Sequence, residues 1–133
     1  METPPCLVHS IEPFLYVPKP ISGFVDEFAG PVLGLKNISS DPSFGILVSP
    51  DSSVRFFLCE APETHDPTKD APEIRMRTTD VDALLRRVKE RAPDYVRPGT
   101  AENGVEEMYG ARQFGTLHKP SGICFIFYQP LDA

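Results

Sequence analysis

The sequence predicts a single α+β domain, residues 1–133, made of two tandem modules that each begin with a strand and a helix and end with further strands. We expect the first module at about residues 8–60, a linker at 61–71 and the second module at about residues 72–130. Two observations predict this division: a strand precedes an amphipathic helix in each half, and similar strand pairs close both halves. The chain therefore contains an internal repeat of roughly sixty residues.

The strand–helix pair is clearest in the second module. Ile74 and Met76 alternate with charged residues in the segment 73–78, which is the period of two expected of a strand with one packed face. The following helix has Asp80 as its predicted N-cap and basic residues towards its end. Its apolar stripe consists of Val81, Leu84, Leu85 and Val88. The apolar side of the strand can therefore meet the helix, and its charged side faces away.

The first module opens with a predicted strand at residues 8–17, in which Pro13 indicates a strand start or an edge position. A helical segment follows and ends at Gly30-Pro31. One stripe of this segment carries Ile21, Phe24, Val25 and Phe28.

Further strands complete both modules. In the first, residues 43–48 and 54–60 form a predicted hairpin, and a strand at about 35–39, weak by propensity, is expected from the repeat. The polar, proline-bearing segment 61–71 is the expected linker. After its helix, the second module is expected to continue with a short strand at 95–97, a loop at 99–107 and a closing hairpin of residues 108–117 and 123–129.

Composition argues against several classes of protein. The formal net charge is −6 and no basic cluster with interleaved aromatic residues occurs, which argues against a nucleic-acid partner. No charged-then-apolar leader follows Met1, and no long apolar run suggests a membrane span. The three cysteines show no metal-finger spacing. We therefore expect a reduced, cytoplasmic protein with no membrane partner.

Three stretches together resemble the vicinal oxygen chelate superfamily, the glyoxalase/bleomycin-resistance/extradiol-dioxygenase fold. They are FAGPVLGL at 28–35, TDVDA at 79–83, and YGARQF at 109–114 followed by HKPSG at 118–122. They follow the family's FYxxxLGF helix ending, DVDA helix start and G-R-x-F…DPDGN hairpin, with Ala29 and His118 as departures. The resemblance covers most of residues 11–129. It implies two βαβββ modules whose curved mixed sheets surround a cavity, with the helices on the outer face, and it implies a homodimer.

The resemblance also bears on metal binding. Members of the superfamily hold a divalent metal at four positions, which by register are Glu12, Phe57 (or Phe56), Glu73 and Ile126. Only two of these side chains are carboxylates, whereas a bound cation usually takes three or more protein donors. We therefore expect no metal or other cofactor, and a divalent metal is the disfavoured alternative. The histidines fall outside the matched positions, in an arm, the linker and a turn: His9, His65 and His118.

The alternation of side chains along each predicted strand places one set of residues against the helices and the other set on the side where a ligand is expected. The helix-packed side is expected to hold Ile11, Leu15, Val17, Val54, Phe56, Leu58, Ile74, Met76, Phe125 and Phe127. The other side has an aromatic base and a few charged groups, which is the usual composition of a small-molecule pocket. Its expected substrate-binding residues are Phe14, Tyr16, Arg55, Phe57, Arg75, Arg77, Ile126 and Tyr128, with Glu12, Glu73, Cys59 and Cys124 beside them.

Two interpretations of Glu12 and Glu73 stay open. Each is a candidate general base, because burial among aromatic residues would raise its basicity, and Arg55 or Arg75 would then hold the developing substrate anion. Alternatively, both glutamates pair with arginines and only neutralise a polar cavity. The two cysteines on this side are expected to be buried fillers, since no histidine is placed to activate them.

Three functions compete. The leading hypothesis is a metal-independent isomerase, lyase or cyclase that transfers a proton on an oxygenated or aromatic anionic metabolite. The second is a non-catalytic protein that sequesters a drug or metabolite, as bleomycin resistance proteins do. The third is a metal-dependent lyase or dioxygenase with displaced ligands, which needs at least Glu12, Glu73 and one histidine. Turnover favours the first, tight binding without turnover the second, and a stoichiometric metal the third.

Overall fold

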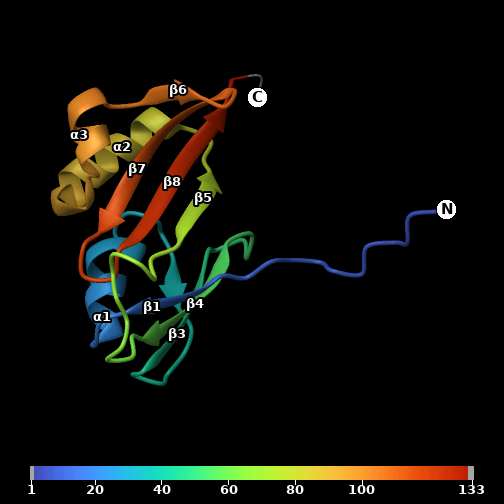
Figure 1. Ribbon diagram of the computed structural model, residues 1–133, viewed down its shortest axis with the longest axis vertical. Helices are drawn as coiled ribbons and strands as arrows, with labels where there is room; N and C mark the ends of the chain where they lie inside the picture. Colours follow the sequence, from blue (N-terminus) through green and yellow to red (C-terminus); the bar gives the residue numbers. More distant parts are fainter. Residues whose placement is uncertain (1, 132–133) are drawn as a thin grey trace.

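The computed structural model describes residues 2–131 and contains two four-stranded mixed sheets with equivalent strand orders (Figure 1). In the first sheet, β1 (Phe14–Val17) lies parallel to β4 (Arg55–Glu60), and β3 (Phe44–Val48) and β2 (Lys36–Asn37) follow in antiparallel pairings. In the second sheet, β5 (Glu73–Arg77) lies parallel to β8 (Ile123–Pro130), and β7 (Ala111–His118) and β6 (Glu106–Met108) follow. The predicted α+β fold of two tandem modules is confirmed.

Each sheet packs against its own helix. The α-helix α1 (Ile21–Phe24) continues into a π-helical turn, η1 (Val25–Ala29), and contacts β4. The α-helix α2 (Val81–Arg91) contacts β7 and β8, and its predicted N-cap is confirmed, since the Asp80 carboxylate accepts a hydrogen bond of 3.0 Å from the Ala83 N–H. No helix among residues 2–131 is long and apolar enough to cross a membrane.

The side of each strand that packs on the helices is the one that alternation predicted, with one exception. Leu15, Phe56 and Phe125 are at most 2% exposed, and Ile74 and Met76 pack against this core. Ile11, predicted on the same side, is 88% exposed. The prediction was wrong because the strand starts at Phe14, and the chain before it runs away from both sheets (Figure 1).

Aromatic residues join the two modules. The Phe28 ring stacks on Tyr95 with centroids 4.6 Å apart and lies 5.9 Å from Phe125 of the second sheet. Arginines of α2 add polar contacts: Arg87 donates to the Val32 carbonyl at 3.0 Å and Arg91 to the Pro31 carbonyl at 2.8 Å. The two sheets are therefore held together through the helical side of the molecule.

The second module differs from the prediction before its closing hairpin. Residues 95–97 do not form a strand, because Pro93 starts a 3₁₀ turn, η2 (Pro93–Tyr95), and Val96 makes a single bridge to Thr116. The expected loop at 99–107 contains the helix α3 (Pro98–Asn103) and β6. The expected strand at 108–117 is interrupted at Tyr109-Gly110, where both residues have positive φ, as in a tight hairpin turn.

The linker packs on the second module. Residues 61–72 form turns without a helix or strand. The His65 ring nitrogen Nε2 lies 3.0 Å from the Ser121 carbonyl oxygen in the β7–β8 turn and, as an N–H, donates to it. Gly122 of the same turn lies directly against Pro67. Whether the modules and linker form one cooperative domain stays a prediction.

Candidate functional site

The side of the first sheet away from its helix carries a cluster of stacked aromatic side chains. We call Phe14, Tyr16, Phe44 and Phe57 the aromatic platform. The Phe14 ring stacks on Phe57 with centroids 6.1 Å apart at an interplanar angle of 17°, and Phe44 lies 5.6 Å from Phe57. Phe14 is 49% exposed and Tyr16 is 41% exposed. Sequence alternation identified three of these residues and missed Phe44, which the β3–β4 register places opposite Cys59.

Glu12 and Arg55 lie at the edge of this platform and pair with each other. The Arg55 Nε atom is 2.7 Å from a Glu12 carboxylate oxygen, and the guanidinium lies 5.8 Å from the Phe57 ring centroid. Both side chains remain more than a third exposed. Glu12 therefore has a cationic partner and is not enclosed by the aromatic residues.

The corresponding side of the second sheet is charged. Glu73, Arg75 and Arg77 project from the edge strand β5, and all three are exposed. The Arg75 guanidinium lies 4.1 Å from the Tyr128 ring centroid, which is a cation–π contact. Ile126 forms a buried apolar position on the neighbouring strand β8 and is 3% exposed. The predicted binding residues thus divide between two sheet faces, one aromatic and one charged.

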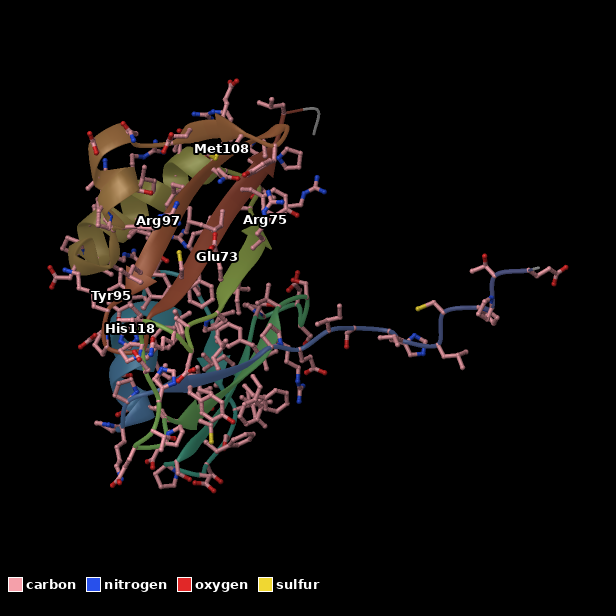
Figure 2. The ribbon with its side chains drawn as sticks, in the orientation of Figure 1. Glu73, Arg75, Tyr95, Arg97, Met108 and His118 are labelled. Atoms are coloured by element: carbon pink, nitrogen blue, oxygen red, sulfur yellow. The ribbon has the colours of Figure 1, made fainter. Side chains whose placement is uncertain are left out.

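Arg97 is a residue of this charged face that sequence reasoning missed. It follows η2 in the chain and is labelled in Figure 2, and its Nη1 atom donates to the Cys124 Sγ atom at 3.4 Å. Burial raises the pKa of the Cys124 thiol, and the neighbouring positive charge of Arg97 opposes that rise. Alternation within strands does not find such a residue, because Arg97 reaches the sheet from a neighbouring segment. The only signal in the sequence is a lone arginine before Pro98.

A cavity of about 780 Å³ lies elsewhere, between η1, η2 and the end of β7. Its lining residues include Asp26, Glu27, Arg91, Asp94, Tyr95, His118 and Lys119. Tyr95 and His118 lie next to each other in Figure 2, and their rings stack with centroids 5.4 Å apart.

The two ring residues of this cavity, Tyr95 and His118, already have hydrogen-bond partners. The Tyr95 hydroxyl donates to Glu27 at 3.1 Å, and burial together with this bond raises the pKa of Tyr95. His118 Nδ1 lies 2.6 Å from the Ser121 hydroxyl, and burial lowers the pKa of His118. Ser121 is fully buried and accepts a hydrogen bond from the Ile123 N–H, so this histidine–serine pair stabilises a turn and does not present a nucleophile. The open sheet faces therefore remain the better candidates.

The four positions that the family resemblance relates to metal binding do not form a donor set. Glu12 lies beside the first sheet and Glu73 on the second, while Phe57 and Ile126 have no donor atoms. Across residues 2–131, no three His, Cys, Asp or Glu side chains lie close enough together to hold a metal ion. These residues do not fit the divalent metal of the superfamily.

Comparison with solved structures shows the same fold. A bleomycin-binding protein in complex with bleomycin is 16% identical, with 92% of this chain and 98% of that chain aligned at a TM-score of 0.66. An antibiotic-binding protein from a Streptomyces species is 20% identical over 94% and 99% of the two chains, also at a TM-score of 0.66. A possible glyoxalase from Bacillus cereus is 19% identical over 91% and 99%, at a TM-score of 0.61.

These similarities concern the fold. No protein-family model matches the sequence, and a search of curated proteins finds no match. The chain has the fold of the bleomycin-binding and glyoxalase/bleomycin resistance proteins, so the vicinal oxygen chelate resemblance is confirmed at the level of structure.

Proposed function

We propose that this protein binds and sequesters a small organic molecule that carries a flat aromatic group, without a metal and without converting it. The aromatic platform is the observation that carries the proposal, because stacked, half-exposed rings on a rigid sheet offer a ready surface for a planar ligand. Bleomycin-binding and antibiotic-binding proteins of the same fold make such a ligand a reasonable first test.

Proton-transfer chemistry is the second candidate function. The observation that favours it concerns Glu73, which has no ion-pair partner within 4.0 Å among the described residues and adjoins Cys124 in the β5–β8 register. Glu12 is the poorer candidate, since its carboxylate is already paired with Arg55. Sequestration fits better because Glu73 is exposed to water on an edge strand, where nothing shields a reacting group from solvent.

We expect bleomycin, or an aromatic antibiotic from a panel tested beside it, to bind at one molecule per chain and to be recovered unchanged by mass spectrometry. Replacement of Phe57 by alanine should weaken that binding about tenfold, because a lost aromatic stack and its buried area contribute roughly 1–2 kcal/mol. Isothermal titration calorimetry measures the effect. Tyr109→Ala is the matched control, since Tyr109 is an aromatic residue that is 88% exposed in the β6–β7 turn.

Two outcomes would count against sequestration. A chemically altered ligand, together with loss of its conversion in Glu73→Gln, would establish the enzyme. Equal affinity of the Phe57→Ala and Tyr109→Ala proteins would remove the aromatic platform from the binding site.

The homodimer that the resemblance implies is part of this proposal. Half-exposed Phe14 and Tyr16 form an apolar surface of the kind that a second subunit covers, and the aromatic face of one copy would complete the charged face of the other. We place the protein in the cytoplasm, since all three cysteines are unpaired.

The dimer is tested by sedimentation velocity. Wild-type protein is expected to sediment as a dimer, and Phe14→Asp as a monomer, because a carboxylate buried in an apolar interface strongly disfavours association. Tyr109→Asp introduces the same charge outside the platform and should remain dimeric. A wild-type monomer at all concentrations would refute this part of the proposal.

A further inference from the structure

The Arg97 guanidinium lies against the second sheet at Gly115, the position on β7 that has no side chain. A β-carbon at Gly115 would come within 2.6 Å of both Cζ and Nε of Arg97, so this position needs glycine for the observed placement. The backbone of Arg97 is fixed as well. Its N–H donates to the Gly115 carbonyl at 3.3 Å, and the Gly115 N–H donates to Thr100 Oγ1 at 2.9 Å. The arginine is thus held in place before any ligand binds.

The positive charge of Arg97 has no anionic partner. The ion pairs among residues 2–131 are Arg55–Glu12 and Arg112–Asp82. The one hydrogen bond of the Arg97 guanidinium goes to the sulfur of Cys124, which is a weak acceptor. A half-buried guanidinium with most of its five donors unused is suited to a carboxylate or phosphate.

A second polar group on the same strand also lacks a partner. Gln113 is only 9% exposed, its Nε2 atom donates to the Met108 Sδ atom at 3.7 Å, and its Oε1 atom has no hydrogen-bond partner. Gln113 and Gly115 are two residues apart on β7, so their positions share one face of the sheet and lie roughly 7 Å apart. A buried amide oxygen without a hydrogen-bond donor is unfavourable unless a ligand or a water molecule donates a hydrogen bond to it.

We propose that this face binds a small molecule whose anionic group, a carboxylate or phosphate, pairs with Arg97 and whose hydrogen-bond donor reaches Gln113. The ligand would lie along β7 and beside Ile126, the buried cross-strand neighbour of Gly115. Glu73 projects from β5 beside Cys124, and its negative charge raises the pKa of that thiol, but it forms no ion pair with Arg97 within 4.0 Å. The inference rests on the proposed function and adds the chemical class of the ligand.

Three aromatic probes test the arrangement on the full chain by NMR titration. The first, 4-aminobenzoate, carries a carboxylate and an amine at opposite ends of one ring. Benzoate lacks the donor, and 4-aminobenzamide lacks the charge. We expect 4-aminobenzoate to bind at least about tenfold more tightly than 4-aminobenzamide, which is the usual weight of one charge-assisted hydrogen bond. Benzoate should bind with intermediate affinity. Equal affinities, or no saturable binding of 4-aminobenzoate at millimolar concentration, would overturn the inference.

Three variants assign the effect to the proposed residues. Arg97→Gln should abolish the preference for the carboxylate probe, and Gly115→Ala should weaken it while the charge is retained, because the new methyl group displaces the guanidinium. Gln113→Leu should make 4-aminobenzoate bind like benzoate. Arg86→Gln, on the exposed side of α2, removes one positive charge elsewhere and should change nothing. Circular dichroism confirms folding of each protein.

Cysteine alkylation offers a readout that needs no ligand. Iodoacetate is an anion and iodoacetamide is neutral, so a free Arg97 should raise the iodoacetate/iodoacetamide rate ratio at Cys124. We expect this ratio at Cys124 to fall about fivefold in Arg97→Gln, from the loss of one unit charge near 4 Å, while the ratio at exposed Cys6 stays unchanged. Peptide mass mapping separates the two sites. An unchanged ratio in Arg97→Gln would overturn the inference, while binding that depends on Phe57 would still support the proposed function.

Discussion

Replacement of Phe28 by alanine is expected to lower the free energy of unfolding by about 3–5 kcal/mol, a large fraction of the stability of a domain of this size. Phe28 is fully buried, and its ring lies between Tyr95 and Phe125. Its removal leaves a cavity at the contact between the two modules, and the lost ring contacts with Tyr95 and Phe125 are not replaced. The loss therefore affects a side chain that contacts both halves of the molecule at once.

Urea unfolding followed by circular dichroism measures this effect, with both proteins at the same concentration so that association does not alter the comparison. Ile11→Ala is the control, since Ile11 is 88% exposed and its removal should change stability by less than about 0.5 kcal/mol. A loss below about 1 kcal/mol for Phe28→Ala would contradict the description of Phe28 as the junction of the modules. Two separate unfolding transitions in the wild type would show that the modules fold independently.

The fold followed from the sequence where periodicity and repetition agreed. The strand at 73–78 and the helix after Asp80 were both predicted from their apolar spacing and are observed as β5 and α2. The strand at about 35–39 was predicted from the repeat although its own propensity is weak, and it is observed as β2 (Lys36–Asn37). The strand and the helix each pack one face against the core, so their patterns are long enough to be diagnostic, whereas β2 has only two residues and neither is buried.

The predictions failed where a pattern was local and tertiary contacts decided the structure. Residues 8–13 alternate like a strand, but the backbone N–H groups find no neighbouring strand before Pro13, whose carbonyl accepts the Phe57 N–H. Tyr95 fits a strand by propensity, yet its ring is buried against Phe28 and its backbone forms a 3₁₀ turn. Neither contact can be read from the sequence near these residues.

Only part of the candidate site was predicted, because a local pattern does not show which side chains tertiary contacts bring to a sheet. Apart from exposed Ile11 and buried Ile126, alternation separated open from packed positions, which located Phe57, Arg75 and Tyr128. It says nothing about side chains that reach a sheet from outside it, such as Arg97, or about which glycine leaves room for them. The family resemblance directed attention to the glutamates and away from the unpaired arginine.

Replacement of Gly122 by alanine is the second change with a large expected effect, a loss of about 2–5 kcal/mol in the free energy of unfolding. Gly122 has φ of +79°, which alone costs an alanine about 1–2 kcal/mol. In addition, a β-carbon would overlap the Pro67 carbonyl oxygen and come within 2.7 Å of the Ala71 β-carbon. Since backbone atoms cannot move aside as a side chain does, the linker would have to leave the β7–β8 turn.

Gly110→Ala separates these two costs. Gly110 has a similar φ of +71°, but a β-carbon there meets no atom within 4 Å. Its variant should lose only the conformational part, about 1–2 kcal/mol, when unfolding is measured side by side with Gly122→Ala. Hydrogen exchange adds a local readout: exchange at the Lys69 and Asp70 amides, which are bonded to the Asp66 carbonyl, should become faster only in Gly122→Ala. Equal losses in both proteins would mean that the contact between the linker and the β7–β8 turn at Gly122 contributes nothing to stability.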